Sequence, residues 1–567
     1  MDLVQWPTPT PSGSETGSSS IEKIIKVIQK LPLETFTGEP GVLLAFEHCI
    51  YLIEYCSMAK IKVIGIRYSW RTLFSIAIVF ILYNVYTVLI KVVLKNKIAC
   101  PNDNNLIHWS LTSQSDYVIS TDDTLKKMGF KYVHFELTNE HIDVLHKHVP
   151  SAPPNDFRRL LERARAFGDG LRQLEALHIM KLCEFVGFTK IPHLPISSSF
   201  SDTDRFITTL VNLEKNLFPF LSRYYRSALH LKYSFSGRGI VLAVGNHHAQ
   251  MAYASIRLLR SMNCNLPIEI FYNGEEDLNS KNRKQLEQLL SVESRNIQEL
   301  IDDTFVKVTG WAIKPFAILF SRFAEVIFMD ADVVFLQDPS SLFNHVGYQR
   351  ARALFYYDRT VGEPNRETVA WLSSLFQKPW NKRLSHANRI LANLSHDNQE
   401  SGVIVLDKLA RFSGLLVTCK LNSINERNSI TYKFFYGDKE TFWLGQEMVD
   451  DDYAFDPHLS GAIGIAAHNL NPKEKLATIC GTQIVHFDTE RKILWFNQFV
   501  LLDKYKSSTT LAHFEHYVQE PGIYSQKSDH IFCLHVTGQV FQLTANEKKL
   551  IATVISYWNE AKSLMKH

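Results

Sequence analysis

Alternating buried strands and amphipathic helices constrain the fold of this chain more than any other feature. From about Gly237, the apolar run "GIVLAVGN" precedes the helical pattern "HHAQMAYASIRLLRSMN", and "LPIEIFYNG" precedes "DLNSKNRKQLEQLLSV". A third helical stretch, "WAIKPFAILFSRF", leads into the apolar run "EVIFMD". This alternation predicts an α/β fold with an open, mostly parallel sheet and flanking helices. Ligands of such sheets bind beyond the carboxyl ends of the strands.

Two aspartates lie at one of those ends, in "FMDADVVFLQDP". On an extended segment, Asp330 and Asp332 point to the same face, roughly 6.5–7 Å apart, and a slight bend would let both serve one hard cation. Mg²⁺ and Mn²⁺ prefer oxygen ligands and keep coordination positions for phosphate oxygens. A turn or solvated loop with two acidic residues is the alternative. The strand before the pair and the parallel-sheet context favour the metal site.

Several motifs in sequence order resemble one family. The block "KPFAILFSRFAEVIFMDADVVFLQDPSSLF", together with "GNHHAQMAYASIRLLR", "QESGVIVLDK", "YGDKETFWLG" and "GTQIVHFD", is similar to the fungal Golgi α-1,3-mannosyltransferases. The resemblance covers roughly residues 235–500. It implies a GT-A-type nucleotide-sugar-binding fold, GDP-mannose as donor, and transfer of mannose in α-1,3 linkage to mannose-containing glycans with retention of configuration.

The resemblance also implies roles for individual residues. Asp330 and Asp332 would hold Mn²⁺ or Mg²⁺ against the donor diphosphate, whose charge a cation neutralises. His486 in "QIVHFD" matches a third metal ligand; a histidine packed on a strand is the alternative. Lys314, one helix upstream, is a candidate for contact with a donor phosphate or ribose; a solvated lysine is the alternative.

A polar group must also lie beside the reacting sugar carbon. Asp438 and Glu440 in "GDKETFW", and Glu400 (with Gln399) in "NQESG", are the candidates, with Asp438 the first choice. The neighbouring aromatic residues, Tyr436, Phe442 and Trp443, offer rings on which a sugar could stack. The alternative is that these rings belong to the core and that the acids lie on the surface.

An uncharged span of 19 residues, 72–90, interrupts the globular pattern. As a helix it would extend ~28 Å at ~1.5 Å per residue, close to the ~30 Å core of a bilayer. It predicts a single transmembrane signal-anchor rather than a buried core helix. Basic residues flank both ends almost equally, so they orient the span only weakly. The family resemblance implies a type II protein of the Golgi membrane with a lumenal catalytic domain, and the sequon at Asn393 fits a lumenal glycoprotein.

These features predict a linear organisation with five parts. The parts are a partly disordered cytosolic tail (1–70), the transmembrane anchor (71–91), a stem (92–150), a helical lobe (151–233) and a GT-A catalytic domain (234–567).

The net charge and the cysteines limit the kinds of ligand and partner that the chain is expected to bind. A net charge of +3 without a basic stripe gives no indication of nucleic-acid binding. The eight cysteines form no zinc motif. Six of them follow the predicted anchor and allow 15 disulfide pairings, among which the sequence does not choose. Cys100 is a candidate for a link between two chains in a homo- or hetero-oligomer.

Two other functions stay open at this point. A different GT-A transferase with a UDP-sugar donor would carry the same aspartate pair, because the pair contacts the diphosphate and neither the base nor the sugar. An inactive, membrane-tethered glycan-binding relative is the second alternative. The sequence does not distinguish N-linked from O-linked or other acceptor glycans.

Overall fold

The computed structural model describes residues 139–150, 153, 155–185, 200–221, 225, 227–467, 477–502, 510–527 and 531–565. The chain divides into two compact units, residues 1–102 with 179–191 and residues 103–178 with 192–567. Of the first unit, only the end of one helix is described. The predicted tail, the transmembrane span and most of the stem lie outside the described residues. No helix within the described ranges is long and apolar enough to cross a membrane.

Helices dominate the second unit ahead of its first strand. They are α5 (Asn139–His148), α6 (Phe157–Phe185), α7 (Phe200–Leu217) and α8 (Ala228–Lys232). A buried ion pair joins two of them, with Lys232 Nζ 2.5 Å from a carboxylate oxygen of Glu175. The division of this part of the chain into a stem and a helical lobe stays a prediction.

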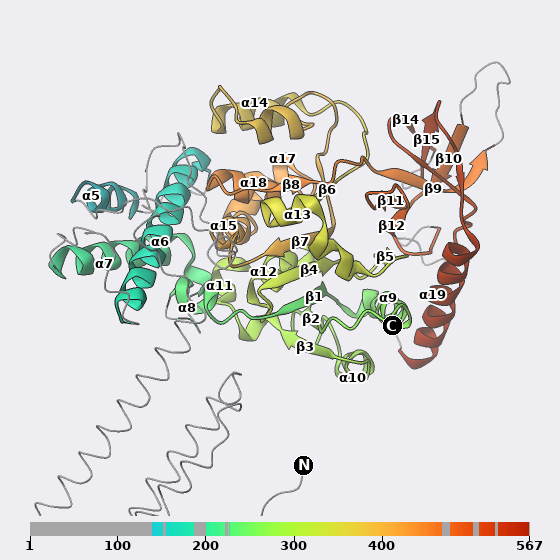
Figure 1. Ribbon diagram of the computed structural model, residues 1–567, viewed down its shortest axis with the longest axis horizontal. Helices are drawn as coiled ribbons and strands as arrows, with labels where there is room; N and C mark the ends of the chain where they lie inside the picture. Colours follow the sequence, from blue (N-terminus) through green and yellow to red (C-terminus); the bar gives the residue numbers. More distant parts are fainter. Residues whose placement is uncertain are drawn as a thin grey trace, which may run out of the picture. The chain divides into compact units, whose positions relative to one another are not determined.

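The predicted α/β sheet is confirmed as a seven-stranded sheet with the order β3-β2-β1-β4-β7-β6-β8 (Figure 1). Its strands are β1 (Arg238–Ala243), β2 (Ile268–Tyr272), β3 (Val292–Asn296), β4 (Glu325–Met329), β6 (Ala353–Tyr357), β7 (Gln399–Asp407) and β8 (Ala454–Phe455). All strands run parallel except β7, which is antiparallel to both its neighbours. Continuous apolar runs such as Ile240–Leu242 are buried, as expected of a sheet covered on both faces.

Helices follow the strands much as the pattern predicts. The helices of this part are α9 (Ala249–Ser261), α10 (Ser280–Glu287), α11 (Asp303–Val306), α12 (Ile313–Phe320), α13 (Val346–Ala351), α14 (Arg366–Leu375), α15 (Phe412–Leu421), α16 (Ile424–Glu426), α17 (Tyr432–Phe434) and α18 (Thr441–Met448). Local capping fixes several of their starts; the Asn279 side chain, for example, accepts a hydrogen bond from the third backbone N–H of α10. α12 packs against β1 and α15, which places its residues beside β4.

A second sheet, which the sequence analysis did not anticipate, forms most of the C-terminal part. Its path is β14-β15-β10-β9-β11-β12-β5, with β13 and β16 branching from β9. The strands are β5 (Val334–Phe335), β9 (Gly461–Ala467), β10 (Ala477–Gly481), β11 (Ile484–Phe487), β12 (Ile493–Phe496), β13 (His516–Gln519), β14 (Ile523–Gln526), β15 (Phe532–Val536) and β16 (Phe541–Gln542). β5 is contributed by the chain just after the aspartate pair, so the two apolar runs around that pair belong to different sheets.

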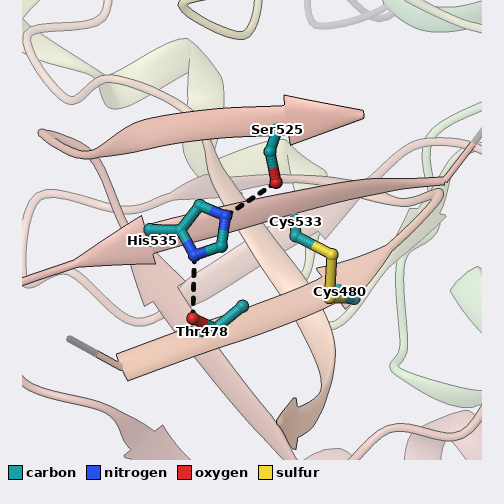
Figure 2. Close-up of a disulfide and its surroundings, with 5 residues drawn as sticks. All are labelled: Thr478, Cys480, Ser525, Cys533 and His535. Carbon is teal, nitrogen blue, oxygen red and sulfur yellow. Dashed lines mark hydrogen bonds between the residues drawn. A yellow bond between two sulfur atoms is a disulfide. The ribbon is translucent and has the colours of Figure 1, made fainter. Parts of the chain in front are cut away.

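One disulfide fixes this second sheet. Cys480 on β10 and Cys533 on β15 are directly opposite each other in the antiparallel ladder and are bonded (Figure 2). Beside them, the His535 ring lies between the hydroxyls of Thr478 and Ser525, at 2.8 and 2.7 Å. Cys264 and Cys419 are free and buried.

The C-terminal helix, α19 (Ala545–Leu564), closes the fold against α9 (Figure 1). Its first turn carries a capping box made by Thr544 and Glu547. Glu560 receives hydrogen bonds from the Tyr253 hydroxyl at 2.8 Å and from Arg257 at 2.7 Å.

Candidate active site

Acidic residues converge on one edge of the seven-stranded sheet. Asp330, Asp358 and Asp456 directly follow β4, β6 and β8, three strands that run parallel. The antiparallel strand β7 begins at the same edge with Gln399 and Glu400. Four strands therefore deliver polar side chains to the carboxyl edge, where ligands of such sheets bind.

A tight turn, rather than an extended segment, presents the aspartate pair. β4 ends at Met329, and the Val333 N–H donates to the Asp330 carbonyl at 3.0 Å. The turn is fixed to both sheets: the Asp330 N–H donates to the Gly402 carbonyl at 2.8 Å, and the Phe499 N–H donates to the Asp332 carbonyl at 2.7 Å. The extended geometry expected for the pair is thus wrong, because the chain changes sheets at this point.

Lys314 lies between two of the candidate carboxylates. Its Nζ is 2.7 Å from Asp330 Oδ2 and 3.9 Å from Asp438 Oδ1, with the Ser401 hydroxyl at 3.4 Å. The expectation of a solvated lysine is wrong, because Lys314 is only 8% exposed. Burial alone would lower the pKa of Lys314, but Asp330 and Asp438 hold that pKa above its ordinary value. The lysine is therefore the fixed positive charge of this cluster.

The pKa values of the two acids beside Lys314 are raised. Burial raises the pKa of Asp330 to about 7; Lys314 opposes the rise and the neighbouring Asp332 adds to it. Burial also raises the pKa of Asp438, which is 2% exposed. Asp438 Oδ2 has no hydrogen-bond partner among the described residues. A buried carboxylate oxygen without a partner is costly and marks a place where a ligand can bind.

A second lysine, which sequence reasoning missed, lies next to Asp438. Lys439 Nζ is 2.8 Å from carboxylate oxygens of both Asp358 and Asp397. Although burial lowers it, the pKa of Lys439 stays above its ordinary value because of these two acids. The lysine connects the loop that carries Asp438 to the end of β6, so it positions that loop. Its place in the motif "GDKE" was the only signal in the sequence.

The other two predicted catalytic acids accept hydrogen bonds from other groups of the protein. Glu440 is fully buried and accepts hydrogen bonds from the Asn398 and Gln399 N–H groups at 2.8 and 3.1 Å. Glu400 accepts from the Gly402 N–H at 2.7 Å and from Asn497 at 2.8 Å. Glu440 therefore orders the start of β7. Burial raises the pKa of Glu400, and the charge of Asp358 adds to the rise.

Two of the three rings suggested for sugar stacking belong to the core. Phe442 and Trp443 are 2% and 0% exposed, so that interpretation is wrong for both. They lie on α18, which is buried along its whole length and packs against α15. Tyr436 is 64% exposed.

His486 is buried in an aromatic cluster. Its ring stacks on Trp495, with centroids 4.1 Å apart, and meets the edge of Tyr356 at 5.0 Å. Burial, aided by Arg359, lowers the pKa of His486 to about 3, so the imidazole is neutral at physiological pH. Its Nε2 has no hydrogen-bond partner among the described residues.

The residues present fit a divalent cation in part. Asp330 and Asp332 are the oxygen donors that Mn²⁺ or Mg²⁺ prefers, and a shared positive charge would relieve the repulsion that raises the pKa of Asp330. Within the part of the chain that the structure describes, no group of three or more His, Cys, Asp or Glu side chains could hold a metal ion. The predicted trio with His486 is thus not assembled here, because the imidazole is packed between Trp495 and Tyr356.

The site lies in a segment shared with known proteins. Residues 237–488 match the family described as "Mannosyltransferase putative". Through this segment, the chain is similar to the fungal α-1,3-mannosyltransferases. The resemblance identified from the sequence motifs is therefore confirmed.

The similarity can be stated for individual proteins. The chain is 30% identical over 331 residues to the putative α-1,3-mannosyltransferase MNN14 of Candida albicans, covering 51% of this chain and 47% of the relative. It is 27% identical over 296 residues to the α-1,3-mannosyltransferase MNT3 of Saccharomyces cerevisiae, covering 46% of each chain. The chain thus spans about half the length of these curated relatives. A solved mannosyltransferase, Ktr4p from S. cerevisiae, matches 37% of this chain and 66% of its own with a TM-score of 0.26 and 13% identity.

Proposed function

We propose that this protein transfers mannose from GDP-mannose to a mannose-containing glycan in α-1,3 linkage, with retention of configuration and with the help of Mn²⁺ or Mg²⁺. One observation carries the proposal. Within the segment that matches the mannosyltransferase family, a charged cluster lies at the carboxyl edge of the sheet, in which Lys314, Asp332 and Asp438 are buried and Asp330 is half-buried.

Each residue of the cluster has a distinct task in this proposal. Asp330 and Asp332 would hold the cation, which when bound neutralises negative charge on the departing diphosphate. Lys314 holds the Asp330 carboxylate in place and keeps positive charge beside the phosphates. Asp438, whose Oδ2 has no hydrogen-bond partner among the described residues, would oppose the positive charge that develops on the sugar ring.

Compartment and topology form a second part of the proposal. We infer a single-pass type II protein of the Golgi membrane with residues beyond about 100 in the lumen. The Cys480–Cys533 disulfide supports an oxidising compartment, since such bonds are rare in the cytosol. Protease treatment of sealed Golgi vesicles should spare the region beyond residue 100 and remove an N-terminal tag. The reverse pattern would overturn this topology.

Donor profiling of the full-length, detergent-solubilised protein tests the activity. GDP-mannose, UDP-glucose, UDP-galactose and UDP-N-acetylglucosamine are offered with an α-linked mannobiose, with Mn²⁺ or with EDTA, and the product linkage is determined. We expect an α-1,3-mannosyl product from GDP-mannose alone, which is lost with EDTA and at least about 100-fold slower in Asp332→Ala. Transfer from a UDP-sugar, or an active Asp332→Ala with an unchanged metal requirement, would overturn the proposal.

A further inference from the structure

Two large aromatic rings lie exposed beside one another at the surface. Trp311 is 46% exposed and Tyr436 is 64% exposed. Their ring centroids are 5.1 Å apart and their planes are inclined by 48°. Exposed apolar side chains that occur singly need no explanation, but two adjacent rings next to charged groups are typical of a binding surface.

The backbone is arranged to bring the two rings together. Trp311 lies in the 3-10 turn Gly310–Ala312, and Tyr436 precedes Gly437, whose φ is +74°. A Cβ on Gly437 would lie 2.7 Å from the indole Cε3 of Trp311. Only glycine therefore combines this left-handed backbone with the close approach of the indole. The backbone of the fold therefore holds the two rings next to each other.

The pair adjoins the candidate active site through both of its segments. Trp311 precedes α12, whose second residue is Lys314, and Tyr436 is separated from Asp438 by Gly437 alone. Lys439 Nζ lies 5.5 Å from the centre of the Tyr436 ring. The exposed rings thus lie next to a cluster in which Lys314, Asp332 and Asp438 are buried.

We propose that Trp311 and Tyr436 form the platform that binds a pyranose ring of the acceptor glycan. The inference deepens the proposed function and rests on it for the identity of the reaction. A hexopyranose has an apolar face of C–H groups and hydroxyls around its edge. Aromatic rings bind the apolar face, and Tyr436 and Lys439 offer polar groups at the edge.

The position of the platform favours the acceptor over the two parts of the donor. In a nucleoside diphosphate sugar, ribose and two phosphates separate the base from the sugar carbon. Rings adjacent to Asp438 are on the sugar side if Asp330 and Asp332 hold the diphosphate. The donor sugar must be enclosed for reaction with a glycan rather than with water. The acceptor, by contrast, enters from solvent and extends back into it, as a half-exposed platform requires.

Kinetics with the full-length protein test this assignment. Trp311→Ala and Tyr436→Ala should each raise the KM for an α-linked mannobiose about 3- to 10-fold, with little change in the affinity for GDP-mannose. Tyr436→Phe keeps the ring and should stay within about twofold of the wild type. Tyr233→Ala removes an exposed ring at the end of α8 and is the matched control, for which no change is expected.

Some results would overturn the platform. An unchanged acceptor KM in Tyr436→Ala would refute it, and so would a loss of GDP-mannose affinity with the acceptor KM intact, which would identify a site for the base. Should Trp311→Ala fail to fold, the more exposed Tyr436 carries the test alone.

Direct binding separates this inference from the proposed function. Saturation-transfer NMR with mannobiose alone should show binding to the wild type and weaker binding to Tyr436→Ala, whichever donor the enzyme uses. Equal binding by both proteins overturns the platform even where mannosyl transfer is confirmed. Transfer of another sugar would refute the proposed function and leave this comparison meaningful.

Discussion

Replacing Lys314 with methionine removes the one positive charge shared by Asp330 and Asp438 and keeps a side chain of similar length. At contact distances of 2.7 and 3.9 Å, Coulomb's law with an effective dielectric constant of ~20 gives gross attractions of ~6 and ~4 kcal/mol. Desolvation of the lysine offsets much of this. Removing one partner from a buried ion pair costs about 3–5 kcal/mol in unfolding free energy, since the remaining charge is left uncompensated. We expect a loss in that range for Lys314→Met at pH 8.

The loss should depend on pH in a defined direction. The folded-state pKa of Asp330 is already raised to about 7, above its ordinary value of 3.8, so the folded protein binds this proton more tightly than the unfolded chain does. Stability from such a group is lost as pH rises through the folded-state pKa. Without Lys314 the pKa rises further, and a neutral carboxyl group needs no lysine. The deficit of the variant should therefore shrink between pH 8 and pH 5.5.

Urea unfolding at pH 5.5, 7 and 8, with and without Mn²⁺, measures this deficit. Mn²⁺ should restore part of the stability of Lys314→Met, because a cation replaces the missing charge between the same acids. Lys281→Met, which removes an exposed lysine of α10, is the matched control and should behave like the wild type. A deficit below about 1 kcal/mol, or one that is equal at all three pH values, would refute the assignment of Lys314 as the counter-charge of the cluster.

Four further substitutions test other parts of the structure. Asp438→Asn should lower kcat by about 100-fold with little change in GDP-mannose affinity or melting temperature, since it removes a charge used mainly in the transition state; normal turnover would exclude Asp438 from the chemistry. Glu440→Gln should instead lower the unfolding free energy by about 1–3 kcal/mol, because the amide nitrogen cannot accept the hydrogen bond that the Trp443 indole N–H donates to Glu440 Oε2; an unchanged denaturation midpoint would contradict this role. Burial raises the pKa of Glu214 to about 7, so the wild type should lose stability as pH rises through 7; Glu214→Gln should be the more stable protein at pH 8 but not at pH 5, as measured by urea unfolding. Cys480→Ser with Cys533→Ser opens a loop with a sequence separation of 53 and should cost about 4 kcal/mol in the chain-entropy model; a loss below 1 kcal/mol in thermal unfolding would show that the second sheet is stable without the bond.

The first sheet was predictable because its elements are local and periodic. Buried runs such as Ile240–Leu242 and Ile268–Tyr272 have the composition of parallel strands, and the pattern of α9 repeats at helical spacing. The second sheet was not predictable, because its strands are short and pair across long stretches of chain. β5, for example, has two residues and pairs with β12. Nothing in the run "VVFLQDP" indicates that it leaves the sheet to which β4 belongs.

The same difference between local sequence patterns and tertiary contacts applies to the residues of the site. Asp330, Asp332 and Asp438 could be proposed as site residues because each lies in a short motif next to a strand or turn that the sequence indicates. Trp311 was missed as a site residue, and its pairing with Tyr436 depends on a close approach at Gly437 that only tertiary structure creates.

His486 shows the limit of assigning roles by motif. An imidazole that stacks on Trp495 and is neutral because of burial has the chemistry of a metal ligand and equally that of a core residue. Its Nε2 has no hydrogen-bond partner among the described residues, but the buried hydroxyl of Tyr348 has none either, so this property does not separate the two roles. To coordinate a cation held by Asp330 and Asp332, the His486 ring would have to reach that cation from its position between Trp495 and Tyr356. Metal binding would then be coupled to the packing between β11, β12 and β6, that is, to the junction of the two sheets.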